Sequence, residues 1–314
     1  IAPVNCNTFG KMSNGLLYNL LLSVYLSATW KVVCAPAMDE DMWRHPATQK
    51  NIATLRERGN TVLTVNSGEL ASGLIGEGRM QEPEDLLIEI KKYFRGKDLE
   101  GYNVLITSGP THEAIDPVRF IANHSSGKMG KALAEAFYEQ GAEVVFITGK
   151  TNYLPVYQDI VIISATSAED MYHETMAKFP QCNIAVLAAA VADYTPETVA
   201  GQKIKKAETH FNLPLKRTKD ILKELGGLKT TQLLIGFALE TNNELENARK
   251  KLEEKNADLI VLNSMNDPEA GFSHDTNKVT ILGRNMENIS TNTLTKKELA
   301  DFIIQIVKEK YSLL

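Results

Sequence analysis

The chain has 314 residues, enough for one large domain or two, and 43% of them are hydrophobic, as expected of a globular protein with a well-buried core. Its formal net charge of −5 argues against a general affinity for nucleic acid or membrane surfaces. The cysteines Cys6, Cys34 and Cys182 form no C-x-x-C pair, which favours a reducing, cytoplasmic compartment and no structural zinc. Cys34 and Cys182 lie in apolar runs and are expected to be buried.

The chain opens on the apolar letters IAPV, with no initiator methionine and no charged region before them. We therefore expect it to start in the middle of a domain rather than at a signal peptide. Helix signals run from about residue 12 to residue 28, and the apolar stretch Leu16–Trp30 is shorter than a bilayer span. Asn19, Ser23 and Ser27 add a polar stripe at helical spacing, so a buried or oligomer-contact helix is expected.

Apolar runs and breakers predict the remaining elements of this first part. The expected elements are strands at 32–37 and 61–65, a loop at 38–46, and helices at 47–58 and 83–93. Residues 67–80 hold four glycines and are expected to form a mobile flap rather than a helix or strand. Residues 95–101, RGKDLEG, are the expected linker between domains at 1–94 and 102–314.

Beyond the linker, strands and helices alternate, which is typical of a doubly wound, mostly parallel α/β sheet. The expected strands are 103–107, 143–148, 184–190, 233–239 and 259–263. The expected helices are 127–140, 167–178, 219–225, 244–256 and 296–311. Val279–Leu282, followed by Gly283, Arg284 and Asn285, indicates a late antiparallel hairpin.

Residues 105–133 are the most informative stretch, because an apolar strand breaks at Ser108-Gly109-Pro110 into a polar loop. The polar side chains of that loop are His112, Glu113, Asp116, Arg119 and Asn123. The loop ends at Ser125, Ser126 and Gly127, where an amphipathic helix begins. A helix start lets unpaired amides and the positive dipole end meet an anion, so a phosphate or carboxylate site is predicted. The alternative is an ordinary connection with a serine cap.

Other polar residues follow later strands of the same part. Asp193, in AAAVADY at 188–194, could hold a ribose, a base or, through water, a metal, or it could cap a helix. Lys203–Lys206 is a basic cluster that favours either a phosphate clamp or a solvated surface. Lys251 and Lys255 share one helix face, where neighbouring glutamates also allow a purely structural role. Phe237 could stack on a base or lie in the core.

Two nucleotide-binding fingerprints are missing. Ala122 and Met129 stand where a P-loop has Gly and Ser or Thr, and no G-x-G-x-x-G follows the first strand of the second part. The second absence weakens a nicotinamide-dependent reductase, which is kept as the alternative enzyme. A non-catalytic flavin-binding or scaffold subunit is the alternative outside enzymes.

These motifs resemble the bifunctional coenzyme A biosynthesis family, in which a phosphopantothenoylcysteine decarboxylase is fused to a phosphopantothenate–cysteine ligase. The ligase signatures are SGPTHEAIDPVRFIANHSSGKMG at 108–130, AAVADY at 189–194, KIKK at 203–206 and GFALETNN at 236–243. They cover essentially all of 100–314 and imply a Rossmann-like sheet. The segments APVNCNT at 2–8, PAMDEDMW at 36–43 and SGELASGLIGEGRM at 67–80 resemble the C-terminal half of the flavodoxin-like flavoprotein domain. The resemblance thus implies an N-terminally truncated chain without the catalytic histidine position.

For the ligase, the resemblance implies that CTP, with Mg²⁺, activates the carboxylate of 4′-phosphopantothenate to an acyl-cytidylate, and that cysteine then displaces CMP. It implies that Lys203 serves the activating step, and that Asn123 and its partner Arg119 hold the acyl-cytidylate. The CTP contacts that it implies are Ala188, Ala189, Asp193, Lys203, Asp220, Ile221, Phe237, Lys251 and Lys255. Ser125, Ser126 and Gly127 would cradle phosphate. It also implies a homo-oligomer: a ligase dimer, with a higher assembly through an intact flavin domain.

For the decarboxylase, the resemblance implies FMN, with Asn5, Asn7 and Thr8 on the flavin and substrate side. The chain departs from the family pattern at two places. Asp39 stands where the family has an Asn that contacts the substrate carboxylate, and an ionised Asp would repel it. Ser72 stands where the family has a Cys proton donor, and a hydroxyl is a far weaker acid than a thiol with a pKa of about 8.5. Because the front half of the flavin domain is absent, decarboxylation is expected only with the missing N-terminus. The two departures are a second, separate reason not to carry the family's decarboxylase mechanism over to this chain.

Overall fold

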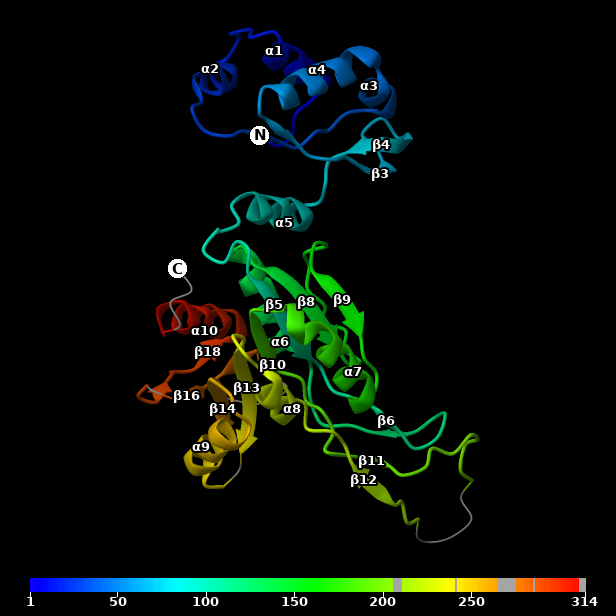
Figure 1. The fold of residues 1–314 in the computed structure, drawn as a ribbon. Helices are drawn as coiled ribbons and strands as arrows, with labels where there is room; N and C mark the ends of the chain where they lie inside the picture. Colours follow the sequence, from blue (N-terminus) through cyan, green and yellow to red (C-terminus); the bar gives the residue numbers. More distant parts are fainter. Residues whose placement is uncertain (206–210, 241, 265–274, 285, 311–314) are drawn as a thin grey trace. The chain divides into compact units, whose positions relative to one another are not determined.

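The computed structural model describes residues 1–205, 211–240, 242–264, 275–284 and 286–310 (Figure 1). The chain divides into two compact units, unit 1 at Ile1–Tyr93 and unit 2 at Phe94–Leu314. Within the described ranges, no helix combines the length and the apolar character that crossing a bilayer requires.

Unit 1 is a small α/β unit with its own core. Its elements are α1 (Cys6–Ser13), α2 (Leu20–Ser27), β1 (Val33–Cys34), α3 (Glu40–Arg44), α4 (Pro46–Glu57), β2 (Thr61–Val62), β3 (Asn66–Glu69), β4 (Ile75–Arg79) and α5 (Pro83–Tyr93). β1 and β2 pair in parallel, with Cys34 and Val62 buried and their neighbours Val33 and Thr61 half-buried. Phe9, Met12, Ile52 and Leu55 are fully buried beside Cys34, whose expected burial is confirmed.

The expected single helix at 12–28 is wrong, because the segment forms two short helices. Gly15 adopts a φ of +68°, which ends the first helix region at little cost. Asn19 then caps α2, its side-chain oxygen accepting a hydrogen bond from the Leu22 amide at 3.0 Å. Only Leu22 of α2 is buried, and Leu20 is 80% exposed, so the expectation of a buried helix is also wrong. An oligomer contact on α2 stays a prediction.

The glycine-rich segment 67–80 forms strands, contrary to expectation. β3 and β4 pair as an antiparallel hairpin, which lies against the segment that follows β1. Gly78, with a φ of +135°, accepts a hydrogen bond from the Met38 amide at 3.0 Å. A Cβ on Gly78 would lie 2.1 Å from the Met38 carbonyl oxygen, so glycine is required for this approach. The short helix α3 also lies within a predicted loop.

Unit 2 is built on one eight-stranded sheet in the order β17-β16-β14-β13-β10-β5-β8-β9. Its strands are β5 (Asn103–Ser108), β8 (Glu143–Thr148), β9 (Val161–Ser164), β10 (Ile184–Leu187), β13 (Leu233–Glu240), β14 (Leu259–Ser264), β16 (Val279–Gly283) and β17 (Ile289–Ser290). The first six are parallel, and their order by sequence is 3-2-1-4-5-6, the doubly wound Rossmann arrangement. The predicted fold class and the late antiparallel hairpin of β16 and β17 are confirmed, whereas β9 was not predicted.

Helices cover both faces of this sheet. They are α6 (Lys128–Glu139), α7 (Ala168–Lys178), α8 (Ile221–Leu228), α9 (Glu244–Glu254) and α10 (Lys296–Lys310), with a 3₁₀ turn at Phe179–Gln181. The connection from β5 to β8 runs toward one edge of the sheet, and the connections from β9 onward to β14 run toward the other. Right-handed crossovers therefore place α6 opposite α7, α8 and α9, which share one core with the sheet. α10 packs against α6.

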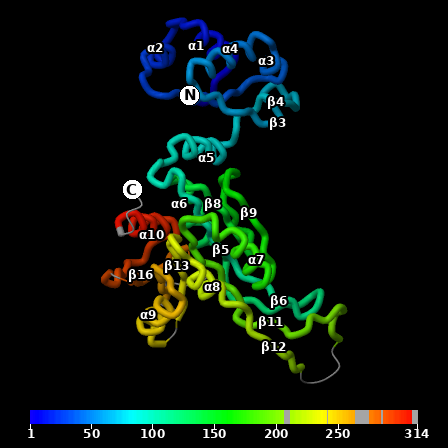
Figure 2. The backbone as a smooth tube through the Cα atoms, in the orientation of Figure 1, coloured from blue at the N-terminus to red at the C-terminus, as the bar shows by residue number. Residues whose placement is uncertain are grey.

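Shorter strand pairs carry the loops beyond the sheet. They are β6 (Glu113–Ala114) with β7 (Phe120–Ile121), β11 (Tyr194–Pro196) with β12 (Leu215–Arg217), and β15 (Thr276–Asn277) with β18 (Leu294–Thr295). Figure 2 shows the chain around β6, β11 and β12 running away from the main sheet, and β11 contacts β6. The expected linker segment packs onto unit 2: Arg95 donates to the Tyr138 and Ala142 carbonyls at 2.7 and 2.6 Å, and Leu99 is buried.

Gly130 brings α6 against β5, and replacing it tests that packing. A Cβ on Gly130 would lie 2.1 Å from the hydroxyl of the fully buried Ser108. Gly130→Ala is expected to lower the free energy of unfolding by about 1–3 kcal/mol, measured from urea denaturation. Gly227→Ala on α8 is the matched control, because a Cβ there meets nothing within 4 Å. Equal stability of both variants would contradict the close approach.

Candidate functional site

A cleft of about 690 Å³ opens at the C-terminal edge of the unit 2 sheet. Its floor includes Thr107 of β5, Leu187 of β10 and Phe237 of β13. β5 and β10 are neighbours whose following helices leave in opposite directions, which makes this place the topological switch point of the sheet. Open α/β sheets bind their ligands at such a point, because the diverging loops leave a crevice there.

The loops after β5 and β10 are joined by hydrogen bonds beside the cleft. The Ala190 amide donates to the Gly109 carbonyl at 2.9 Å, and the Ala192 amide donates to the Thr111 hydroxyl at 3.0 Å. From the other side, the Thr218 hydroxyl donates to the Ala192 carbonyl at 2.7 Å. The backbone of 188–193 is therefore fixed from both sides, as a preorganised ligand site requires.

The cleft is strongly cationic in a chain that is net acidic. Its charged lining consists of the cations Arg217, Lys219, Lys223, Lys251 and Lys255 and the carboxylates Asp193 and Asp220. The excess of cations in one concave site suits a polyanionic ligand such as a nucleotide triphosphate. Phe237 adds an aromatic surface on which a base could stack.

Asp220 organises one wall of the cleft. It caps α8, with one carboxylate oxygen accepting from the Lys223 amide at 3.0 Å, and the other oxygen pairs with the Lys255 ammonium. Burial raises the pKa of Asp220, but these partners and the nearby Lys251 outweigh burial and hold the pKa below its ordinary value. Asp220 is thus ionised at neutral pH and fixes the end of the Lys255 side chain at the cleft.

Asn123 joins the long loop after β5 to the loop after β10. Its side-chain amide donates to the Val191 carbonyl at 2.9 Å, and Val191 lines the cleft. Further along, Gly127 has a φ of +79° and is the N-cap residue of α6. The hydroxyls of Ser125 and Ser126 accept from the amides of Gly127 and Lys128 at 3.3 and 3.4 Å, so a serine meets the first amide of this helix, that of Lys128.

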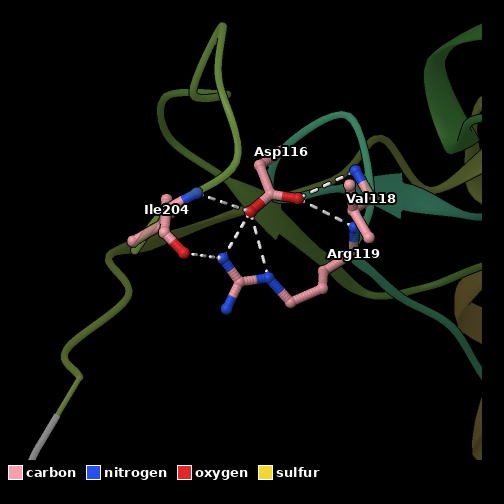
Figure 3. Close-up of polar contacts among 4 residues, drawn as sticks. All are labelled: Asp116, Val118, Arg119 and Ile204. Carbon is pink, nitrogen blue, oxygen red and sulfur yellow. Dashed lines mark hydrogen bonds and ion pairs between the residues drawn. The ribbon is translucent and has the colours of Figure 1, made fainter. Parts of the chain in front are cut away.

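Asp116 ties two loops together (Figure 3). One carboxylate oxygen accepts from the Val118 and Arg119 amides, both at 2.9 Å. The other accepts from the Arg119 guanidinium at 3.0 and 2.5 Å and from the Ile204 amide at 3.1 Å. The guanidinium also donates to the Ile204 carbonyl at 2.9 Å. The Arg119 guanidinium and the three amides keep the pKa of Asp116 well below its usual range.

Most of the residues that the family resemblance implies as CTP contacts line the cleft. Those that line the cleft are Ala189, Asp193, Asp220, Ile221, Phe237, Lys251 and Lys255. Ala188 directly precedes them, and its amide bonds the Thr107 carbonyl. Lys203 is exposed on the loop between β11 and β12 and, in the described part of the chain, is outside the cleft lining. Sequence reasoning missed Arg217, Lys219 and Lys223, although LKRTKD at 215–220 holds as many basic residues as KIKK at 203–206, namely three.

In unit 1, the three motif segments meet. The Val4 amide donates to the Ala35 carbonyl at 2.8 Å, and the Ala37 amide donates to the Val4 carbonyl at 3.0 Å. Asn5, directly after Val4, caps α1, and its side chain accepts from the Thr8 amide at 2.9 Å, while Asn7 and Thr8 lie in the first turn of that helix. The start of α1 therefore lies beside the 36–39 segment, against which the β3–β4 hairpin also packs.

The two departures from the family pattern contact each other. The Ser72 hydroxyl donates to the Asp39 carboxylate at 2.7 Å. Asp39 is the residue before α3 and makes no side-chain cap bond, whereas Ser72 lies at the exposed tip of the β3–β4 hairpin. A negatively charged acceptor and a hydroxyl thus stand together where the resemblance implies a neutral amide and a thiol.

The two units define a class of protein in which a small α/β unit precedes a Rossmann-like domain with a cationic cleft. Residues 1–95 match the family described as Flavoprotein, and residues 99–311 match the DNA/pantothenate metabolism flavoprotein C-terminal domain. The chain belongs to the family of the coenzyme A biosynthesis bifunctional proteins CoaBC. The predicted resemblance is thereby confirmed.

Two relatives and one solved structure illustrate the similarity. The Bacillus subtilis (strain 168) coenzyme A biosynthesis bifunctional protein CoaBC is 42% identical over 97% of this chain and 76% of its own length. A cysteine/cysteine sulfinic acid decarboxylase from an unknown prokaryotic organism is 50% identical over 97% of this chain and 87% of its own length. A crystal structure of the C-terminal domain of a CoaBC protein superposes with a TM-score of 0.59 at 40% identity, covering 69% of this chain and 99% of that domain.

Proposed function

We propose that unit 2 ligates 4′-phosphopantothenate to cysteine in coenzyme A biosynthesis, with CTP activating the acid as an acyl-cytidylate. The observation that carries the proposal is the cationic cleft at the switch point between β5 and β10. Membership of the family that includes the CoaBC proteins supports the reaction, and Phe237 beside five cations supports a nucleotide triphosphate as the activating substrate.

The residues fit the charge changes of the first step. Activation builds negative charge at phosphorus and at the acyl oxygen, and fixed cations stabilise that charge. Lys203, on the loop that Asp116 ties down, is the cation that we assign to this step, while Lys251 and Lys255 hold phosphate in the cleft. Asp193 fits Mg²⁺, because this ion is commonly bound by one or two carboxylates together with substrate phosphates and water, whereas both oxygens of Asp220 already accept from Lys223 and Lys255.

Nucleotide-dependent pyrophosphate release tests the ligase. The chain is expected to release pyrophosphate from CTP and 4′-phosphopantothenate without cysteine, and to release CMP only when cysteine is added. CTP should also raise the melting temperature, because a ligand that binds only the folded state stabilises it. Stabilisation by NADH in place of CTP, with no pyrophosphate released, would instead support the nicotinamide-dependent reductase.

For unit 1 we propose FMN as the cofactor, supported by the Flavoprotein match at residues 1–95. The exposed Asn7 and the half-buried Thr8 offer donors and acceptors of the kind that hold a flavin's polar edge. Bound FMN would supply two-electron chemistry. We also propose that the chain works in the cytoplasm as a homo-oligomer, which the exposed apolar side chains of α2 support.

The Asp39–Ser72 pair favours a second candidate function, decarboxylation of a free amino acid by unit 1. A carboxylate repels the substrate carboxylate but attracts an ammonium group, which free cysteine carries and N-acylated cysteine lacks. The 50% identical relative is called a cysteine/cysteine sulfinic acid decarboxylase, which supports this substrate class. The reaction breaks the bond to the carboxyl carbon, releases carbon dioxide and adds a proton at the α-carbon, with no net oxidation.

Asp39→Asn is expected to exchange these substrate preferences. With FMN supplied, and with the N-terminal part of the flavoprotein unit that decarboxylation is expected to need, the wild-type protein should release more carbon dioxide from cysteine or cysteine sulfinic acid than from phosphopantothenoylcysteine. The variant should lose roughly 10- to 150-fold in kcat/KM for the free amino acid, the range expected when a bond to a charged group is lost. Asp41→Asn is the control, because Asp41 is an exposed carboxylate in α3, two residues after Asp39. Unchanged selectivity in Asp39→Asn, or a wild-type preference for the acylated substrate, would refute the second function.

A further inference from the structure

Asp116 makes a buried contact that no role described so far requires. Its side chain has no exposed surface. Its carboxylate accepts hydrogen bonds from its own loop and from Ile204, which lies 88 residues later in the chain. One oxygen closes the turn at 116–119, and the other receives the Arg119 guanidinium and the Ile204 amide (Figure 3). Both oxygens are therefore occupied by donors.

This contact fixes the main chain next to Lys203. The Ile204 amide is held by Asp116 at 3.1 Å, and the Ile204 carbonyl is held by the Arg119 guanidinium at 2.9 Å. A second tie lies four residues earlier, where the Ala200 amide donates to the Ile115 carbonyl at 3.0 Å. Bonds to ionised groups are about twice as strong as neutral ones, so the Asp116–Arg119 pair is the stronger of the two ties.

Arg119 is largely committed to this contact. Its Nε and one Nη donate to Asp116, and the same Nη also donates to Ile204, although 44% of the side chain is exposed. The guanidinium thus acts as a bidentate fork that joins a carboxylate to a carbonyl, a geometry that a lysine ammonium cannot reproduce. The arrangement joins the long loop after β5 to the lysine-bearing loop between β11 and β12.

We propose that Asp116 is a positioning residue for the activating step: through Ile204, it holds the loop that presents Lys203 to the reacting phosphate. This inference rests on the ligase function proposed above. A cation accelerates a reaction only when it is held where charge develops, and a misplacement of about 1 Å can cost 100-fold in rate. Asp116 acts through Lys203 and need not touch substrate.

Asp116→Asn replaces one of the two carboxylate oxygens by an NH₂ group and keeps the other oxygen. The amide oxygen can still close the 116–119 turn, but the new NH₂ group then faces the Arg119 guanidinium and the Ile204 amide, which are donors. We expect pyrophosphate release from CTP and 4′-phosphopantothenate to fall by up to about 100-fold. CTP affinity, measured by calorimetry, should stay within about 3-fold, because the cleft lining does not include Asp116.

A double-mutant cycle with Lys203→Gln decides whether Asp116 acts through that lysine. Asp116→Asn should slow the wild-type enzyme by up to about 100-fold but the Lys203→Gln enzyme by less than about 3-fold. Equal losses in both backgrounds would overturn the proposal. If the wild-type chain itself releases no pyrophosphate, the ligase function fails, and that result is distinguishable from failure of the positioning role.

Asp258→Asn is the matched control for fold stability. Asp258 is also a largely buried carboxylate, and it accepts from the Lys229 ammonium at 2.7 Å and the Leu234 amide at 2.8 Å. It precedes β14, at the sheet edge opposite the cleft, so its loss should lower the melting temperature and leave pyrophosphate release unchanged. If Asp116→Asn does not fold, Arg119→Lys replaces it in the cycle, and an uncoupled loss there overturns the proposal in the same way.

Discussion

Lys203→Gln is expected to slow pyrophosphate release from CTP and 4′-phosphopantothenate by about 10²- to 10³-fold, the loss typical when one charge-stabilising group is removed from a transition state. The lysine lies beside Ile204, whose amide and carbonyl are both held by side chains of the long loop after β5. Its backbone is therefore preorganised while its side chain is exposed to solvent. Glutamine removes the charge and keeps a polar, unbranched side chain that is one atom shorter.

The fold should survive this change, because Lys203 lies on an exposed loop. CTP should still raise the melting temperature, since Lys251 and Lys255 in the cleft are intact. Lys216→Gln is the matched control. Lys216 is exposed on β12 beside Arg217, and successive strand residues point to opposite faces, so its charge is directed away from the cleft that Arg217 lines. Wild-type pyrophosphate release by Lys203→Gln would refute the assignment of this lysine to the activating step.

The sheet of unit 2 could be predicted because its signals are local. Strands buried on both faces form continuous apolar runs, and each is followed by a helix pattern, so alternation alone indicates a doubly wound sheet. β9 was missed because the run Val161–Ser164 is short and its residues are mostly exposed at the edge of the sheet. In unit 1, the hairpin was missed because its glycines serve a distant contact: Gly78 is required by the Met38 carbonyl, about forty residues earlier in the chain.

In the candidate site, too, local features could be predicted from the sequence and contacts between distant loops could not. Asp116 and Arg119 are three residues apart, so their pairing could be expected from spacing, but their joint hold on Ile204 depends on how two loops fold together. Lys219 lines the cleft because it directly precedes Asp220, the N-cap residue of α8. The Asp39–Ser72 contact was also beyond sequence reasoning, although both departures from the family pattern were visible. Tertiary contacts between loops carry little sequence signal.

Asn123→Asp is expected to affect the second half-reaction rather than the first. The side-chain amide of Asn123 donates to the Val191 carbonyl at 2.9 Å, which holds the loop before α6 against the cleft. An ionised aspartate can only accept hydrogen bonds, so it would place an oxygen against that carbonyl and a negative charge beside an anionic acyl-cytidylate. Pyrophosphate release should remain within about 10-fold of wild type, while transfer to cysteine should fall by about 10²-fold or more.

The intermediate itself gives the measurement. Mass spectrometry of the quenched reaction should show the acyl-cytidylate accumulating on Asn123→Asp in the presence of cysteine, where the wild-type enzyme consumes it. Asn123→Ala removes the same donor without adding charge. If transfer to cysteine falls less in Asn123→Ala than in Asn123→Asp, the difference between the two losses comes from repulsion of the anionic intermediate. If Asn123→Asp neither accumulates the intermediate nor releases pyrophosphate, Asn123 is needed already for activation. The contact with Val191 would then serve to shape the CTP cleft.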